Sequence, residues 1–195
     1  MTQDWLVDNR GQVRPLETQA MAERETPYRL YRFLTEVEDI LANNSNPQAQ
    51  LQQIVPRVRY LLDHSPWIAM PIFPNPDTGW EVLMLYDEPD FPLTVQIVAW
   101  AAGTVSPIHN HGCWGLVALL DGQEQNQFWQ RSEDQLETTT TQLLNPGEIL
   151  TFLPDSIHQI TALGDQPTIS FNLYGETDYQ RRFEYDPISH QAVVF

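Results

Sequence analysis

The sequence has few basic residues. Lysine and arginine together number 10 against 26 aspartates and glutamates, so the formal charge of the 195-residue chain is −16. A surface this acidic repels the phosphate backbone of nucleic acids, and it repels anionic membranes for the same reason. We therefore expect neither a nucleic acid nor a membrane among the partners of the protein.

The sequence also contains only one cysteine and no long apolar segment. The single cysteine, Cys113, cannot form an internal disulfide, which favours a reducing compartment. The first 15 residues contain no apolar stretch of signal-peptide length, and nowhere do 18 uninterrupted apolar residues occur. These absences predict a cytoplasmic protein. Nothing in the sequence indicates its oligomeric state.

The chain divides into two patterns without a flexible linker between them. Apolar residues recur at helical spacing in residues 30–41 and again in 51–62, and Asn46 followed by Pro47 is typical of the start of a second helix. We predict that residues 1–65 form an N-terminal helical extension. This extension is expected to pack on a β-barrel of residues 66–195 as part of the same domain.

Short β-prone runs separated by turn residues dominate the chain from about Trp67 onward. Strands so numerous and so short are typical of a mainly β sandwich or barrel. Nine strands are predicted: Glu81–Tyr86, Leu93–Ala102, Trp114–Leu120, Gln125–Arg131, Glu137–Leu144, Glu148–Leu153, His158–Leu163, Thr168–Tyr174 and Phe183–Asp186.

Two histidines separated by one residue give the first indication of chemistry. On a strand, His109 and His111 would point to the same face, because side chains alternate with a period of two. Two neutral imidazoles side by side are suited to binding one divalent metal ion. Such pairs also occur on surfaces and in hydrogen-bonded cores, so the pair alone leaves a structural interpretation open.

A third histidine lies in a second turn-rich stretch, and together the two stretches resemble the motifs of the cupin superfamily. Gly103, His109 and His111 match the first cupin motif, in which five residues separate a glycine from His-x-His. Gly147 and His158 have the spacing of the second motif. The resemblance implies a cupin jelly-roll (double-stranded β-helix) barrel with a metal held by the three histidines inside it.

The sequence departs from the cupin pattern at several positions. In the second motif Pro154 is displaced by one residue, and Ser156 stands where the family has glycine. More informative is the first motif, in which the usual glutamate ligand would fall at Gly115 or Leu116. Glu124 lies too far along the chain and near a turn. A neutral three-histidine site results, and it favours an anionic ligand such as a thiolate.

A three-histidine cupin site resembles that of the thiol dioxygenases, the cysteine dioxygenase family. The likeness spans roughly residues 26–180 and includes a Ser-x-His-x-Tyr segment, which Ser170, Asn172 and Tyr174 match by position. Asn172 replaces the histidine of the relay; it can hydrogen-bond but cannot shuttle a proton. Alternation along a strand puts these three residues on one face, as a relay requires.

The resemblance implies a mononuclear non-haem Fe(II) centre with a small thiol and O2 as its substrates. The thiol would bind as thiolate, and both atoms of dioxygen would be delivered to sulfur to give a sulfinic acid. Tyr174 would donate a hydrogen bond towards the bound oxygen or substrate, and Ser170 would polarise the relay. Two alternatives keep the fold: a cupin metalloenzyme of other chemistry, such as an isomerase or lyase, and a non-catalytic cupin that binds a metal or a small ligand.

The identity of the thiol is not evident, because the family's carboxylate anchor is missing. Relatives carry an arginine or a glutamine on the strand well before the first motif, whereas this chain has Val82 and acidic or apolar neighbours there. Arg181 or Arg182 could provide a cation from another direction. Cys113 and Trp114, next to the ligand pair, are further candidates for the substrate pocket, although a small buried cysteine is the more ordinary interpretation.

Overall fold

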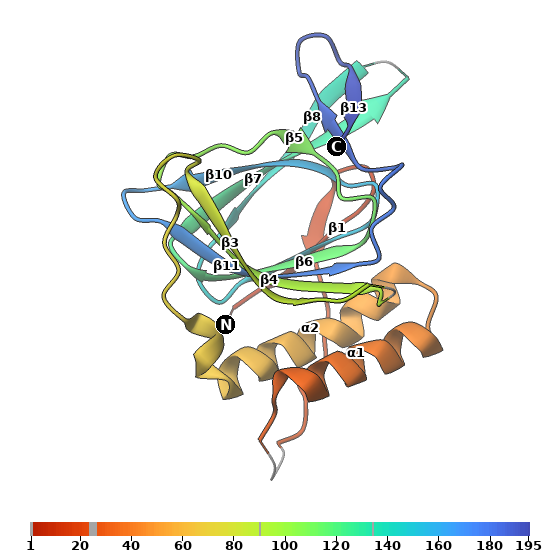
Figure 1. The fold of residues 1–195 in the computed structure, drawn as a ribbon. Coiled ribbons are helices and arrows are strands. Elements are labelled where there is room, and N and C mark those ends of the chain that lie inside the picture. Colours follow the sequence, from red (N-terminus) through yellow and green to blue (C-terminus); the bar gives the residue numbers. More distant parts are fainter. Residues whose placement is uncertain (1, 24–26, 90, 134) are drawn as a thin grey trace. The chain divides into compact units, whose positions relative to one another are not determined.

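The computed structural model describes residues 2–23, 27–89, 91–133 and 135–195 (Figure 1). The chain forms two compact units, one of Met1–Pro15 with Ile72–Phe195 and one of Leu16–Pro71. The first is built from strands and contains all the residues singled out above for chemistry. The second is helical.

The β unit consists of two sheets that curl around a common interior (Figure 1). One sheet has the strand order β2-β1-β9-β6-β11-β4-β3 and the other β13-β12-β5-β10-β7-β8. The strands are β1 (Asp4–Val7), β2 (Val13–Pro15), β3 (Trp80–Asp87), β4 (Leu93–Trp100), β5 (Ile108–His109), β6 (Gly115–Asp121), β7 (Gln123–Ser132), β8 (Gln135–Leu144), β9 (Ile149–Phe152), β10 (Ile157–Leu163), β11 (Thr168–Gly175), β12 (Phe183–Tyr185) and β13 (Ala192–Val194). This mainly β, two-sheet architecture is that of a cupin jelly roll, as the motifs predicted.

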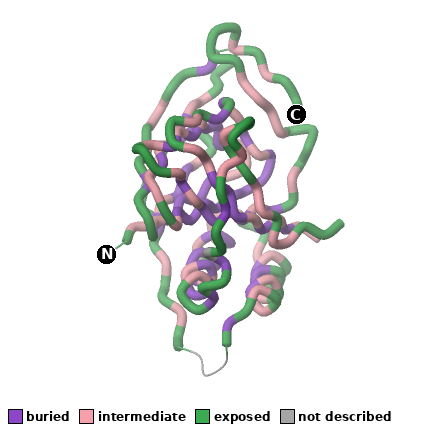
Figure 2. Tube along the Cα trace, turned by 60° about the vertical axis from the view of Figure 1, so that its left-hand side comes forward, coloured by how far each residue is buried: buried purple, intermediate pink, exposed green. Residues whose placement is uncertain are grey.

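The core of the β unit lies between its two sheets, where buried residues gather (Figure 2). It draws apolar side chains from both: Val7, Val117, Leu119, Phe128, Leu144, Leu150 and Phe152. Each comes from a strand whose alternate residues face inward, and each is essentially inaccessible to solvent. Burial of this apolar surface is the main stabilisation of such a fold.

All nine predicted strands are present, with ends within two residues of those expected. The predicted boundary at residue 65 is different in the structure. Residues at the start of the chain form β1 and β2 of the seven-stranded sheet, and β1 pairs in parallel with β9, about 145 residues away in the sequence. Such a distant pairing leaves no local pattern. Because β1 and β2 belong to the β unit, residues 1–65 are not a purely helical extension.

The helical unit contains α1 (Leu30–Asn43), α2 (Pro47–His64) and a short 3₁₀ helix, η1 (Pro66–Ala69). The predicted start of the second helix is confirmed, because the Asn46 side chain accepts a hydrogen bond from the Ala49 amide at 3.1 Å and Pro47 takes the first helical position. That this unit packs on the barrel as part of one domain stays a prediction. Among the described helices none is long and apolar enough to cross a membrane.

Candidate metal centre

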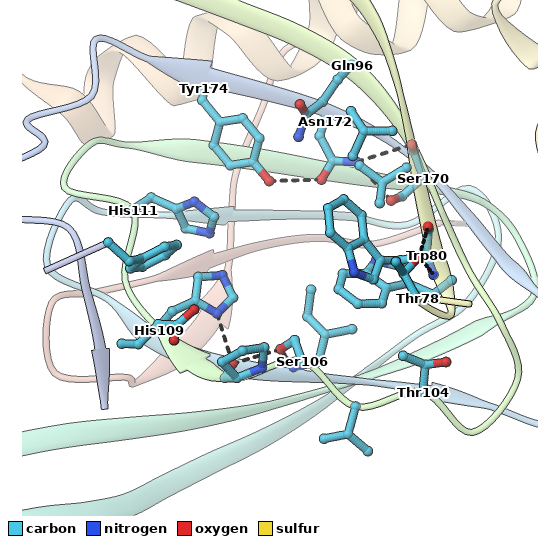
Figure 3. Close-up of a pocket in the computed structure, with 18 of the residues that line it drawn as sticks. Thr78, Trp80, Gln96, Thr104, Ser106, His109, His111, Ser170, Asn172 and Tyr174 are labelled. Atoms are coloured by element: carbon cyan, nitrogen blue, oxygen red, sulfur yellow. Dashed lines mark hydrogen bonds between the residues drawn. The ribbon is translucent and has the colours of Figure 1, made fainter. Parts of the chain in front are cut away.

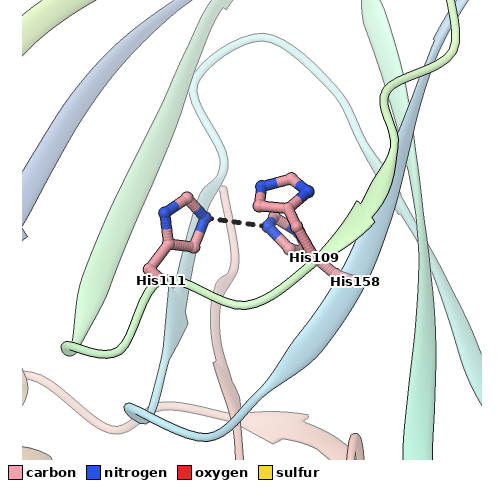
Figure 4. A group of neighbouring side chains, drawn as sticks. All are labelled: His109, His111 and His158. Carbon is pink, nitrogen blue, oxygen red and sulfur yellow. Dashed lines mark hydrogen bonds between the residues drawn. The ribbon is translucent and has the colours of Figure 1, made fainter. Parts of the chain in front are cut away.

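Three histidines from two segments of the chain meet inside the β unit (Figure 4). His109 ends β5 and lies opposite His158 of β10 in the antiparallel register. His111 lies past the end of β5 and not on a strand, so the predicted strand alternation is not what directs it towards His109. Gly112, with φ of 65°, turns the chain directly afterwards, and the three rings converge.

The distances between the rings fit a shared ion. Their candidate ligand atoms all lie within 4.8 Å of one another, and His111 Nε2 is 3.0 Å from His158 Nε2. Two nitrogens that are each about 2.1 Å from one metal ion, at right angles, lie about 3.0 Å apart. The predicted convergence of the three histidines is therefore confirmed.

Hydrogen bonds orient two of the rings for coordination. His109 donates from Nδ1 to the Pro107 carbonyl at 3.0 Å, and His158 donates from Nδ1 to Asn126 Oδ1 at 3.0 Å. Each bond leaves the Nε2 lone pair of its ring free to bind a metal, which is how metal-binding histidines are commonly held.

Burial keeps the histidines neutral. It lowers the pKa of His109 to about 4, and it lowers the pKa values of His111 and His158 well below the ordinary 6.5. For His111 the positive charge that His109 and His158 would carry adds to the effect of burial. A neutral imidazole is the form that coordinates metal, so the donor set is ready to bind a divalent ion at neutral pH.

The missing cupin glutamate has a structural explanation. A Cβ atom added at Gly115 would lie 2.2 Å from the ring of Phe152 and 3.0 Å from Tyr174. These two rings also stack on His111, with ring centroids 5.0 Å and 4.7 Å from it. Aromatic side chains thus fill the space that a glutamate would need. Within the part of the chain that the structure describes, no carboxylate joins the three-histidine cluster.

One carboxylate does reach the site indirectly, against our expectation for Glu124. This residue lies inside β7, is fully buried, and accepts a hydrogen bond from Asn126 Nδ2 at 2.7 Å. The other end of the Asn126 amide accepts the hydrogen bond from His158. The sequence distance from the first motif was misleading, because β7 pairs with β10, so that Asn126 reaches His158 and Glu124 in turn contacts Asn126.

The three residues of the predicted relay are connected. Tyr174 donates from its hydroxyl to Asn172 Oδ1 at 3.1 Å, and Asn172 Nδ2 donates to Ser170 Oγ at 2.9 Å. All three line the same cavity as His109 and His111 (Figure 3). Burial raises the pKa of Tyr174, which keeps its hydroxyl protonated and able to donate a hydrogen bond.

The cavity beside the histidines has a volume of about 500 Å³. Val82 lines it, as predicted. Cys113 and Trp114 are not among its lining residues: the Cys113 thiol lies 3.6 Å from Thr177 Oγ1, and the indole of Trp114 packs against Gly175. They were expected in the pocket because they adjoin the ligand pair, but the chain there is a turn and the strand begins only at Gly115.

Among the described residues that line the cavity, the cation is Arg182. Its neighbour Arg181 points elsewhere and pairs with Asp155. Asn110, the residue between the two histidine ligands, hydrogen-bonds to the backbone of Arg181 and Phe183 and so fixes the segment that carries Arg182. The guanidinium lies 4.2 Å from the Phe195 ring, and its buried Nε has no hydrogen-bond partner among the described residues.

Sequence reasoning missed several residues of the site, including Gln96, which lines the cavity and hydrogen-bonds the Tyr174 side chain. It also missed the roles of Asn110, Asn126 and Glu124. The inward alternation of Glu124 and Asn126 with Phe128 along β7 was the one available signal. A polar pair at inward positions of a core strand indicates a buried network.

Comparison with solved structures gives distant likenesses, among them one to a cupin superfamily protein. KdgF from Halomonas sp. is 17% identical over 52% of this chain and 83% of that chain, with a TM-score of 0.42. A cupin superfamily protein from Desulfitobacterium hafniense is 13% identical over 57% and 88%, with a TM-score of 0.44. Oxalate oxidase in complex with the substrate analogue glycolate is 14% identical over 52% of this chain and only 53% of that chain, with a TM-score of 0.41.

These likenesses are too weak to carry an argument about function. No protein-family profile matches the sequence. The fold assignment rests on the order of the strands in the two sheets, and the assignment of a metal centre rests on the three histidines.

Proposed function

We propose that this metal-binding cupin is a non-haem Fe(II) thiol dioxygenase that converts a small thiol and O2 to a sulfinic acid. The observation that carries the proposal is the neutral three-histidine centre next to a hydrogen-bonded Ser170–Asn172–Tyr174 chain. Bound Fe(II) would hold the thiolate sulfur and dioxygen together and pass electrons from sulfur to oxygen. The reaction balances: R–SH and O2 give R–SO2H, with both oxygen atoms on sulfur.

The residues of the cavity have distinct roles in this proposal. In the structure the single hydroxyl hydrogen of Tyr174 is donated to Asn172 Oδ1, and Gln96 also hydrogen-bonds this side chain. When substrate binds, the hydroxyl would turn and donate that hydrogen to the negative charge that develops beside the centre instead. Asn172 orients this hydroxyl but transfers no proton, because an amide does not titrate. Its partner Ser170, fully enclosed, fixes the amide in turn.

Arg182 provides the anchor that the sequence lacks at the usual place. Its guanidinium lies in the cavity wall, and its buried Nε has no hydrogen-bond partner in the part of the chain that the structure describes. A buried polar donor of this kind is costly unless a ligand pairs with it. An arginine fork matches a carboxylate, so a thiol that also bears a carboxylate fits the arrangement best.

Oxygen consumption tests this proposal directly. Purified protein is loaded with Fe(II) under nitrogen and mixed with aerated thiols, among them cysteine, 3-mercaptopropionate and cysteamine. We expect uptake of one O2 per sulfinate formed, and no uptake by a His158→Ala variant. Absence of uptake with every thiol, from protein that retains its iron, would contradict the proposal.

The alternative of a metal centre without dioxygenase activity is favoured by one observation, the amide of Asn172 where the thiol dioxygenases have histidine. Elemental analysis after growth with added iron discriminates. Zinc or manganese in the purified protein, with little iron, would support a cupin of other chemistry or a metal-binding role.

A further inference from the structure

The cavity has a second end that the metal chemistry does not use. There its wall is formed by Trp80 and Trp100, which are partners across β3 and β4 with ring centroids 6.1 Å apart. Figure 3 shows Trp80 across the cavity from His109 and His111. Trp80 leaves 45% of its surface exposed, although tryptophan is among the residues that gain most from burial. A ligand in the cavity can cover this surface.

The chemistry of the lining changes from one end to the other. Around the histidines the walls carry Tyr174 and Arg182, whereas next to the tryptophan pair Val82 and Val98 form the following inward pair of β3 and β4, and Thr78 lies beside Trp80 (Figure 3). Sites of 300–1,000 Å³ typically bury ligands well above the size of an amino acid, with a few polar groups that fix orientation. A thiol the size of cysteine would fill only the polar end of this cavity of about 500 Å³.

We propose that the natural substrate carries an apolar, preferably aromatic, body that lies against Trp80 and Trp100 while its thiol and its acidic group occupy the histidine end. This inference rests on the proposed function for the thiol, but the apolar subsite itself does not. Flat rings suit it because offset or edge-on contacts with indoles add to the gain from burial.

A ligand without sulfur tests the subsite apart from the reaction. Binding of 3-phenylpropionate and of propionate to the Fe(II)-loaded protein under nitrogen is measured by calorimetry. We expect 3-phenylpropionate to bind at least tenfold more tightly, and Trp80→Ala to remove about five- to tenfold of that preference. The matched control is Trp67→Ala, another exposed tryptophan, which is not among the residues that line the cavity.

Equal affinity for the two acids, or an equal loss in the two variants, would overturn the subsite. If Trp80→Ala does not fold, Trp100→Leu replaces it. A second arm compares kcat/KM for 2-mercapto-3-phenylpropionate and 3-mercaptopropionate, and we expect the aryl thiol to be preferred. Failure to oxidise either thiol would contradict the proposed function while leaving the binding result to decide the subsite.

A different observation carries a second inference, about Glu124. Its Oε2 is buried and has no hydrogen-bond partner among the described residues, and its Oε1 is joined through the Asn126 amide to His158. A carboxylate in such a place is costly unless positive charge is near. Burial raises its pKa to about 7. A divalent ion bound by three neutral histidines would bring the positive charge that is otherwise missing.

We infer that Glu124 is a positioning residue of the metal centre, which acts through Asn126 to hold the His158 ring and to offset the charge of the ion. Such outer partners of a metal-bound histidine commonly change metal affinity by about 10–100-fold. In the cupin pattern a glutamate binds the metal directly. In this chain the negative charge of Glu124 is separated from the ligand His158 by two hydrogen bonds.

Metal affinity and metal-free stability together test this role. Competition with a chelator gives the Fe(II) and Zn(II) affinities of wild type, Glu124→Gln and the exposed control Glu137→Gln. We expect about a tenfold or greater loss for Glu124→Gln only, together with a metal-free protein at least as stable as wild type. The glutamine keeps an acceptor for Asn126 but has no charge.

A double-mutant cycle shows whether the effect passes through the amide. In an Asn126→Leu background, Glu124→Gln should change metal affinity by less than twofold. Unchanged metal affinity in Glu124→Gln, or a loss of the same size in the Asn126→Leu background, would overturn the inference. Neither measurement requires oxidation of a thiol.

Discussion

The interior of the β unit differs on the two sides of its three histidines. On one side lie the closely packed rings of Phe128 and Phe152, whose centroids are 6.1 Å and 5.2 Å from that of His158. On the other side is the open cavity with Arg182 and the partly exposed Trp80. The packed side holds the ligands in place, while the open side selects what reaches them. Substitutions on the packed side should therefore lower metal content or stability, whereas those on the open side should lower the reaction rate or the affinity for substrate.

The largest effect is expected for loss of the ligand on the packed side. His158→Ala should lower bound metal from about one ion per chain to near zero, because two imidazoles are a much weaker donor set than three. Elemental analysis measures it. The matched control, His64→Ala in the helical unit, should retain its metal. Full metal content in the His158 variant would show that the ion lies elsewhere.

A core substitution sharpens the comparison in terms of stability. Phe152→Ala should lower the free energy of unfolding by about 3–5 kcal/mol, because it leaves a cavity among fully buried neighbours. Val82→Ala, which borders an existing cavity, should cost less than about 1 kcal/mol. Urea titrations of the two variants measure the difference. Similar costs would mean that the two sides are equally well packed.

On the open side, Tyr174→Phe should impair the reaction and spare the metal. Loss of the hydroxyl removes the hydrogen bond donated at the centre, for which we expect roughly a 100-fold lower kcat. Metal content and the melting temperature should change little, because the ring that stacks on His111 remains. Tyr179→Phe, at an exposed tyrosine, is the control. If metal content fell as much as kcat, Tyr174 would have a role in holding the metal and not in the reaction.

A smaller and more selective effect is expected at Arg182. Arg182→Gln should raise KM about tenfold for thiols that carry a carboxylate and leave KM for cysteamine, which carries none, nearly unchanged. Arg181→Gln should affect neither thiol, since that guanidinium pairs with Asp155. Steady-state oxygen uptake gives both constants. An equal rise for cysteamine would show that Arg182 does not recognise the carboxylate.

The smallest effect is the pH dependence of the metal-free protein. The pKa of Glu124 is about 7 when folded and about 4.5 when exposed, so the folded state binds its proton more tightly. Wild type should lose stability relative to Glu124→Gln as the pH rises from 4.5 through 7, with no further change above. Melting temperatures across this range check it. The lowered pKa values of the histidines cancel, because both proteins contain them.

The sequence predicted the parts of this molecule that depend on local spacing. His109, His111 and His158 lie in motifs with fixed spacing, and the residues from Ser170 to Tyr174 alternate on one strand. The sequence alone therefore predicted that the histidines converge and that the relay residues share one face. The place of β1 depends on a strand pairing between distant segments of the chain. The position of Arg182 depends on a hydrogen bond from Asn110, 71–73 residues away. Neither of these leaves a local pattern.

Turns explain the predictions that failed. Cys113 and Trp114 were candidates for the pocket because they adjoin the histidine pair, but the chain turns at Gly112 and resumes as a strand at Gly115. Glu124 was set aside because it follows a turn, yet the turn returns the chain into the core as β7. In each case the geometry of one glycine-containing turn decided which side chains face the metal.

The most direct test of the central claim is the origin of the oxygen in the product. Fe(II)-loaded protein is given its best thiol under isotopically labelled dioxygen, and the sulfinate is examined by mass spectrometry. We predict that both of its oxygen atoms carry the label and that the His158→Ala variant forms none. A product with one or no labelled oxygen, or only disulfide, would contradict the claim that this centre is a thiol dioxygenase.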